Sequence, residues 1–232
     1  MGKLLTLIST FHIMVKGLLA IVSHPDDETF GCGGTLVKHV TRDVDTNVLC
    51  LTCNPSNRKT EFKAATDILG VNSEIWMRQD IDNGTDLIHK IADHIDELRP
   101  KTVITHVPID YHNEHKTCYN LVTEAIEWAA HTTIYDEAWQ VERLLSMEIN
   151  TLIPNPSVLV DISDFYDVKN AAINKYSSQL AKFPWGYYQS FNRKKAELRG
   201  AQSNVKYAEA FLEESLPRNG PFYGEKSTNL LV

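Results

Sequence analysis

Short apolar runs alternate with longer amphipathic segments from Gly17 onward, and this alternation restricts the chain to few folds. Four of the short runs have the length and apolar character of buried strands, and turn or polar residues follow each of them. These runs are Leu18–Ser23, Asn47–Thr52, Glu74–Met77 and Thr102–Thr105. Strands that alternate with helices form βα units, which build a mostly parallel sheet with helices on its faces. We therefore expect an α/β fold.

The segments between these runs are expected to be helices. They are Gly34–Thr41, Lys59–Leu69 with Gly70 as its C-cap, Asp86–Leu98 ahead of Pro100, and His115–Ala130. Beyond Thr133 the pattern is mixed. It predicts strands at Leu144–Ile149 and Val158–Asp161 and helices near Asp164–Leu180 and Arg193–Ala201.

A chain of 232 residues fits a single hydrophobic core, and no low-complexity linker divides it. We predict one domain over residues 14–232, with residues 1–13 as an N-terminal appendage. The apolar stretch Leu4–Val15 contains polar residues and is shorter than the roughly 20 residues that a membrane span needs. It also lacks the cleavage site of a signal peptide, so we expect no stable membrane insertion.

The net charge of −7 argues against binding to nucleic acid or to an anionic membrane, because both attract clustered Lys and Arg. Four cysteines in a chain of this length do not indicate a disulfide framework, so we expect a reducing, cytoplasmic compartment. A small polar molecule suits this surface as a substrate. The sequence leaves open whether the chain forms a homo-oligomer.

Polar residues directly follow the first and the fourth predicted strands. Ser23–Glu28 (SHPDDE) follows the first strand, and His106–His115 (HVPIDYHNEH) follows the fourth. In open parallel sheets, ligands bind outside the carboxyl ends of the strands. We therefore expect the two segments to be neighbours at one site.

His24 and Asp27, together with a histidine from elsewhere, would supply the ligands of a catalytic zinc, which uses three protein ligands and one open position. Zinc lowers the pKa of its water towards about 7, and a carboxylate outside the ligand set can take the proton as the water attacks a carbonyl. Asp26 is placed for that role. The alternative is that the motif is a solvated acidic turn that caps the following helix.

The glycines of Gly31–Thr35 (GCGGT) allow close approach of the backbone and tight packing between strand and helix. They do not fit a dinucleotide fingerprint, because the G-x-G-x-x-G spacing is incomplete. In addition, the second strand ends in Thr52-Cys53-Asn54, with no acidic residue to bind a ribose.

Together these motifs resemble the PIG-L/LmbE-like family of zinc-dependent N-acetylglucosaminyl deacetylases. The family's first hallmark matches His24–Glu28 with Gly33–Thr35, and its later His-Pro-Asp-His resembles His112–His115. Further matches are Arg58 with Glu61 and Ala65, Lys175–Gln179, and Lys206–Phe211. The resemblance spans residues 17–211. It implies a Rossmann-like (LmbE-like) sheet in a single domain and the removal of an N-acetyl group from an aminosugar conjugate.

The resemblance also implies roles for individual residues, with one Zn²⁺ per chain. His24, Asp27 and His115 would bind the zinc, and Asp26 would be the general base. By the same resemblance, His112 would steady the oxyanion or protonate the leaving amine, and Arg58 would contact the substrate.

The sequence departs from the family at Asn113-Glu114, which stand in place of Pro-Asp. Glu114 keeps a carboxylate that would orient His112, although its longer side chain changes the geometry. Asp110 is a further candidate beside the ligands, and His106 is either a supporting residue or a satisfied polar group at the end of a strand.

Two other features have competing interpretations. Cys50 and Cys53 form a CxxC pair, but an offset of three on a strand places them on opposite faces, so buried thiols are favoured over redox or metal chemistry. The aromatic stretch Phe183–Tyr188 (FPWGYY) forms either a wall on which a sugar stacks or ordinary core packing.

Two rival functions fit part of the pattern. A metal-dependent phosphoesterase would need a second cation, held by Asp26 or Asp110. A sugar-binding module without turnover would need no free base such as Asp26.

Overall fold

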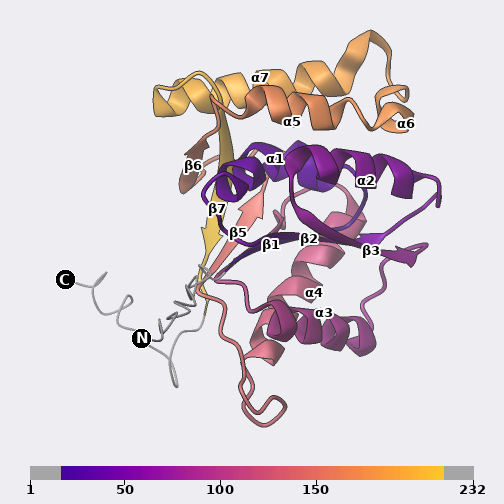
Figure 1. Ribbon diagram of the computed structural model, residues 1–232, viewed down its shortest axis with the longest axis vertical. Helices are drawn as coiled ribbons and strands as arrows, with labels where there is room; N and C mark the ends of the chain where they lie inside the picture. The colour runs from indigo at the N-terminus through magenta and orange to yellow at the C-terminus, as the bar shows by residue number, and fades with distance from the viewer. Residues whose placement is uncertain (1–16, 217–232) are drawn as a thin grey trace, which may run out of the picture.

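The computed structural model describes residues 17–216, and its centre is a seven-stranded sheet (Figure 1). The strands are β1 (Leu18–Val22), β2 (Thr46–Thr52), β3 (Asn72–Arg78), β4 (Thr102–His106), β5 (Arg143–Met147), β6 (Val158–Asp161) and β7 (Ala208–Glu214). Their order is β3-β2-β1-β4-β5-β7-β6. The pairings from β3 to β5 are parallel, whereas β7 runs antiparallel to both β5 and β6. The prediction of a mostly parallel α/β sheet is confirmed.

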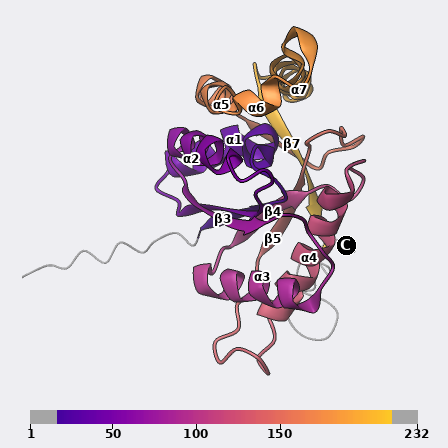
Figure 2. The same ribbon diagram turned by 90° about the vertical axis from the view of Figure 1, so that its right-hand side faces the viewer.

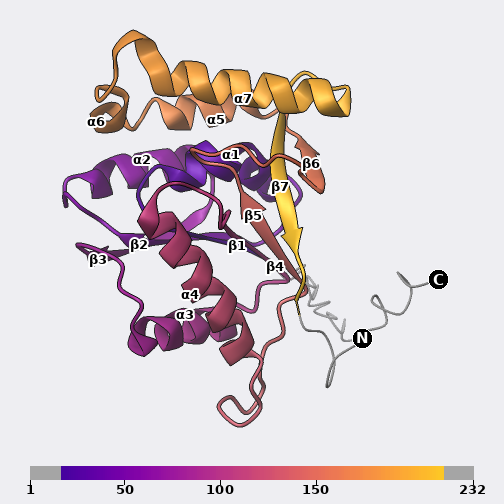
Figure 3. The same cartoon turned by 180° about the vertical axis from the view of Figure 1, so that it is seen from behind.

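Helices cover both faces of this sheet. They are α1 (Asp27–Val40), α2 (Arg58–Leu69), α3 (Thr85–Leu98), α4 (Asn113–Ala129), α5 (Tyr166–Ile173), α6 (Ser177–Leu180) and α7 (Tyr187–Ser203), with a 3-10 turn η1 at Pro184–Gly186. α3 and α4 lie on one face and α1 and α2 on the other (Figures 1 and 3). α5, α6 and α7 form an outer layer beyond α1 and α2 (Figure 2).

β1 shows why an apolar run becomes a central strand. All five of its residues are buried. Leu18, Ala20 and Val22 face the core beneath α1 and α2, whereas Leu19 and Ile21 face the core of α3 and α4. A parallel strand with helices on both sides must be apolar on both faces, which explains the continuous run in the sequence.

α1 begins at Asp27, seven positions before the predicted start at Gly34. The predicted helix starts at Gly34 and so omits Gly31 and Gly33. Glycine in general disfavours helical backbone. Packing overrides that preference. A Cβ atom on Gly34 would lie 2.8 Å from three carbons of Ile162, so the helix reaches its neighbours only where glycine is present. The expected close approach of the backbone is therefore observed.

The C-terminal part of the chain departs most from the sequence prediction. The helix expected near Asp164–Leu180 is two helices, α5 and α6, and α7 begins at Tyr187 rather than Arg193. β7 was not predicted, because the charged residues Glu209, Glu213 and Glu214 interrupt its apolar pattern.

All four cysteines are buried free thiols. Among the described residues, no helix is long and apolar enough to cross a membrane. The predicted appendage at residues 1–13 lies outside the described part of the chain.

Candidate metal centre and active site

The segments that follow β1 and β4 meet at one edge of the sheet. β1 pairs with β2 on one side and with β4 on the other. Successive strands are therefore added on one side of β1 up to β3 and on its other side from β4 onward, so the strand order reverses between β1 and β4. Ligands of such sheets bind at this switch point. A cavity of about 450 Å³ opens there. Seven of the eight predicted site residues line it, namely His24, Asp26, Asp27, Arg58, His112, Glu114 and His115. The eighth, Asp110, is fully buried.

His24 lies between two carboxylates. Its Nδ1 is 3.2 Å from Asp27 Oδ2, and its Nε2 is 2.6 Å from Glu114 Oε2. Burial by itself would lower the pKa of His24, but the hydrogen bonds with these two carboxylates raise it to about 9. Glu114 therefore orients His24 and not His112, which differs from the expectation from the sequence.

His115 is also held between two carboxylates. Its Nε2 is 3.3 Å from Asp27 Oδ1, and its Nδ1 is 3.4 Å from Asp110 Oδ1. Burial alone would lower the pKa of His115, but the charge of Asp27 and the interaction with Asp110 raise it to about 10. Asp110 is fixed in turn, because it accepts hydrogen bonds from the backbone N–H groups of His112 and Asn150.

These two histidines fit a metal. Each has one ring nitrogen next to an outer carboxylate and the other next to Asp27, the arrangement in which a ligating imidazole donates its second N–H to a carboxylate. Ligand atoms of a tetrahedral zinc with bonds of about 2.0–2.1 Å lie roughly 3.3 Å apart, close to the separations between Asp27 and the two rings. Ligating imidazoles must be neutral, so a divalent cation would take the place of the protons that the carboxylates hold on His24 and His115.

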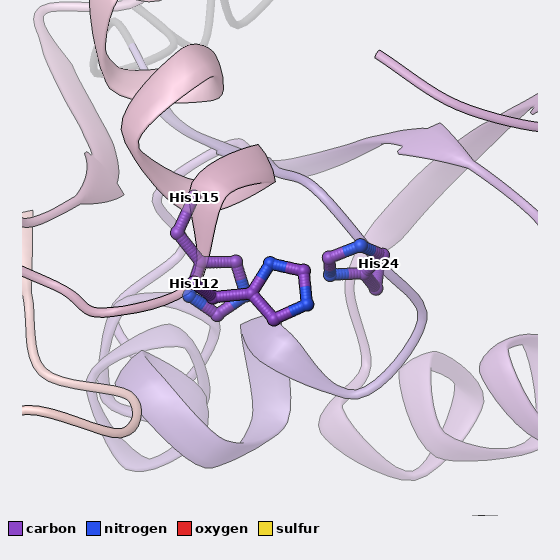
Figure 4. A group of neighbouring side chains, drawn as sticks. All are labelled: His24, His112 and His115. Atoms are coloured by element: carbon purple, nitrogen blue, oxygen red, sulfur yellow. The ribbon is translucent and has the colours of Figure 1, made fainter.

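His112 adds a third ring to this cluster. Figure 4 shows the rings of His24, His112 and His115 grouped at the N-terminal end of α4. One ring nitrogen from each of the three histidines lies within 4.8 Å of the other two, so His112 is a further candidate ligand or a neighbour of the metal. Its Nδ1 has no hydrogen-bond partner among the described residues. Burial, followed by the charges of His115 and His24, lowers the pKa of His112.

A second candidate metal group combines Asp27, His106 and His115, but His106 is already engaged. Its Nε2 accepts a hydrogen bond of 2.9 Å from the backbone N–H of Ser23, which occupies the lone pair that a metal would need. Its ring also stacks on His115, with centroids 4.0 Å apart. His106 therefore packs against His115 and is not itself a free ligand.

Asp26 stays outside the paired carboxylates and histidines. Its Oδ2 lies 3.0 Å from Arg58 Nη2, and Arg58 also donates to the backbone carbonyl of Pro25. Burial and the neighbouring charge of Asp27 raise the pKa of Asp26 to about 8, against the opposing charge of Arg58. Arg58 is buried and lines the cavity, so its guanidinium holds Asp26 in place beside any ligand.

The turn that presents Asp26 is strained. Asp26 has φ 116° and ψ −29°, a conformation rarely adopted by residues other than glycine. Glu28 stabilises the turn, because it accepts a hydrogen bond from the backbone N–H of Asp26 and others from the hydroxyl groups of Thr29 and Tyr176. The fifth residue of the HPDDE motif is thus a buried anchor.

The sequence did not identify Asn150, which follows β5 and lines the cavity. Its backbone N–H and its side chain both approach Asp110. Lys195 holds the same loop, since its ammonium group donates to the carbonyl oxygens of Glu148 and Ile149. Neither residue has a local signal in the sequence, because both act through contacts between distant elements.

The fold and this cluster define an α/β protein with a candidate metal centre at the switch point of its sheet. Residues 19–126 match the PIG-L family, described as GlcNAc-PI de-N-acetylase. The conserved protein TT1542 of Thermus thermophilus is 30% identical, with a TM-score of 0.77 over 90% of this chain and 98% of that one. The chain belongs to the PIG-L family.

Two further similarities bear on the reaction. The diacetylchitobiose deacetylase of Thermococcus kodakarensis is 26% identical over 84% of this chain and 82% of its own. GalB of Pseudomonas putida, a 4-carboxy-2-hydroxymuconate hydratase, is 21% identical with a TM-score of 0.77 over 90% of this chain and all 100% of its own. The sequence relative is thus a deacetylase, whereas the fold is shared with an enzyme of another class. The fold alone does not decide the reaction.

Proposed function

We propose that this chain is a zinc-dependent N-deacetylase that removes the acetyl group of an N-acetylglucosamine-type conjugate. The observation that carries the proposal is the division of labour between adjacent carboxylates. Asp27 lies between His24 and His115, whereas Asp26 faces Arg58 and remains outside that set. When a metal ion activates the water that hydrolyses an amide, one set of residues must hold the metal, and a separate base must accept the proton of the water. The deacetylase relative supports the same reaction.

His24, Asp27 and His115 are the residues that would hold one zinc ion per chain. Zinc bound there would polarise the amide carbonyl and lower the pKa of a water molecule. Asp26 would accept the proton of the attacking water, and Arg58 would keep its carboxylate in position. Acetate and a free amine are the products.

The attack also creates negative charge on the amide oxygen, and the leaving nitrogen must gain a proton. His112 lines the cavity from the start of α4, close to both His24 and His115. A hydrogen-bond donor at this place would stabilise the oxyanion, an interaction typically worth about 3–4 kcal/mol. We assign His112 this role and the transfer of the proton to the amine.

The geometry favours a deacetylase over a phosphoesterase. A second cation would have to be held by Asp26 or Asp110. Asp26 is paired with Arg58, and both oxygens of the buried Asp110 already accept hydrogen bonds. A site with one cation per chain is therefore the expectation, and metal analysis of the purified protein would distinguish the two.

The direct test is the release of primary amine from a panel of N-acetylglucosamine derivatives by the zinc-loaded protein. The Asp26→Asn variant keeps the size of the side chain, and asparagine tolerates positive φ better than most residues. We expect its rate to fall by about 10²–10⁴ with one zinc per chain retained. Zinc-loaded wild type that releases no amine from any derivative, or a variant that keeps the parental rate, would contradict the proposal.

A further inference from the structure

A second cavity of about 380 Å³ adjoins the candidate active site. The two cavities share wall residues: Phe30, Tyr111, Ile149, Asn150 and Tyr188. A molecule bound at the histidine cluster can therefore continue into the second cavity without leaving the protein surface. We call this second cavity the aromatic groove, because six aromatic residues line it in addition to Phe30. They are Tyr111, Phe183, Trp185, Tyr187, Tyr188 and Phe191.

Four of the aromatic side chains of this groove are exposed rather than packed in the core. Trp185 is 93% exposed and Tyr111 is 71% exposed, and Phe183 and Tyr187 are also exposed. Trp185 has φ 61°, a left-handed conformation that costs free energy for a residue with a side chain. Large apolar surfaces grouped beside a cavity commonly mark a binding site.

The rings connect the groove to the candidate active site. Phe183 contacts both Tyr187 and Tyr188, with centroids 5.3 and 5.5 Å apart. Tyr188 stacks on Phe30 at 5.4 Å, and Phe30 lies in α1 three residues after Asp27. An aromatic surface thus extends from exposed rings to the wall of the candidate active site.

Asn192 gives the lining of the groove a buried polar group. Asn192 lines the cavity and is 1% exposed. Its amide group donates to the carbonyl of Tyr188, but its Oδ1 has no hydrogen-bond partner among the described residues. A buried acceptor without a partner costs about 1–3 kcal/mol, which a hydroxyl group of a ligand could recover.

We propose that the aromatic groove binds a second sugar ring, joined to the N-acetylated ring whose amide lies at the histidine cluster. The inference rests on the proposed deacetylase function and extends it to the class of substrate. A pyranose has an apolar face of C–H groups that can cover an aromatic ring, and hydroxyl groups at its rim that need acceptors. Exposed aromatic rings together with the free acceptor Oδ1 of Asn192 match both requirements.

A long acyl chain is the rival occupant of the groove. It would cover the same rings but would leave Asn192 Oδ1 without a partner, at the cost given above. The polar acceptor therefore favours a hydroxylated ring.

The test compares wild type with Trp185→Ala, because Trp185 is almost fully exposed and its removal does not disturb the core. Amine release would be measured from N-acetylglucosamine, from its β-1,4-linked disaccharide N,N′-diacetylchitobiose, and from N-octanoylglucosamine. We expect wild type to prefer the disaccharide. The disaccharide-to-monosaccharide ratio of kcat/KM should fall about three- to tenfold in Trp185→Ala, the effect of one lost ring contact. Trp185→Phe should recover most of the ratio.

Leu198→Ala is the matched control, since Leu198 is exposed on α7 and lines neither cavity. An unchanged ratio in Trp185→Ala would overturn the inference while amine release leaves the deacetylase function standing. Loss of octanoyl turnover alone would assign the groove to an acyl chain and would also overturn it.

Tryptophan fluorescence during titration with the disaccharide separates the two proposals. A change in wild type that disappears in Trp185→Ala would support the groove even if no amide were cleaved, in which case only the proposed reaction would fail. No change in wild type at concentrations that support turnover of the disaccharide would contradict binding at Trp185.

Discussion

Gly33 and Gly34 are neighbours in α1, yet the structure predicts opposite effects when each is replaced by alanine. A Cβ atom on Gly33 would lie 3.4 Å or more from its nearest neighbours, Lys169, Leu69 and Thr29, which is ordinary contact. A Cβ atom on Gly34 would lie 2.8 Å from three carbons of Ile162, which is fully buried. The two substitutions therefore differ mainly in steric overlap.

The expected magnitudes follow from two opposing terms. Alanine in place of glycine inside a helix stabilises by about 1 kcal/mol, and this gain applies to both variants. Overpacking a filled core costs about 1–3 kcal/mol, and this cost applies only to Gly34→Ala. We expect Gly33→Ala to raise the free energy of unfolding by up to about 1 kcal/mol. Gly34→Ala should unfold about 1–3 kcal/mol more easily than Gly33→Ala.

Urea unfolding of wild type and both variants, followed by circular dichroism, measures these differences. The slopes with urea should agree, so that the midpoints report stability rather than a change in compactness. Equal stability of the two variants would refute the reasoning, because the helix term is common to both and only the contact with Ile162 separates them.

Glu114, which contacts His24, and Lys195, which contacts the loop after β5, give two further predictions. Glu114→Gln should weaken zinc binding about tenfold, the lower end of the usual 10–100-fold effect, because this carboxylate is partly exposed. The control Glu124→Gln, on the exposed face of the same helix, should leave zinc affinity unchanged. Competition with a chelator measures both affinities, and equal values for the two variants would exclude orientation of His24 by Glu114. Burial, followed by the charge of Lys169, lowers the pKa of Lys195 from 10.5 to about 7, so the unfolded chain binds more protons than the folded chain between these two values. Above pH 7, the free energy of unfolding of wild type should therefore rise relative to that of Lys195→Met, by up to about 1.4 kcal/mol per pH unit. Urea unfolding of both proteins between pH 7 and 9 measures this difference in stability. A difference that stays constant over this range would contradict a lysine that loses its proton on folding.

The sequence predicted the first half of the fold well because its elements follow simple patterns. β1 and β4 are apolar runs buried on both faces, and their observed bounds differ by one residue from those expected. The end of α2 at Gly70 was also correct, since Gly70 adopts φ 73° as the C-cap. These features depend on local sequence, which is why pattern alone identifies them.

β7 and its contacts depend on distant partners. Glu209 breaks the apolar pattern of β7, yet it is 4% exposed because it accepts from the backbone N–H groups of Gly34 and Thr35 and pairs with the buried Lys169. A charged residue inside a strand is expected to be exposed unless its partner is known. The same limit explains why Asn150 and Asn192 were missed.

The candidate site was predictable for a different reason. The residues of the HPDDE motif and of the histidine segment are short polar sequences directly after strands, and the order of parallel strands brings those two ends together. The pairing within the site was not predictable. Glu114 contacts His24 across 90 positions of sequence, and only the folded structure distinguishes this from a contact with its neighbour His112.

A hydratase shares this fold, so the reaction depends on the residues of the site and not on the fold. Adding water to a double bond produces no leaving group, whereas hydrolysis of an amide must deliver a proton to nitrogen as the C–N bond breaks. A deacetylase therefore needs a group that handles a proton in addition to the base that activates water. Asp26, at the start of α1, and His112, at the start of α4, line one cavity from two different elements, so in the proposed mechanism they would act on different atoms of the same amide. Because hydration of a double bond also needs a base for the water and a proton donor for the carbon, it is the deacetylase relative, and not the separation of these two groups, that favours amide hydrolysis.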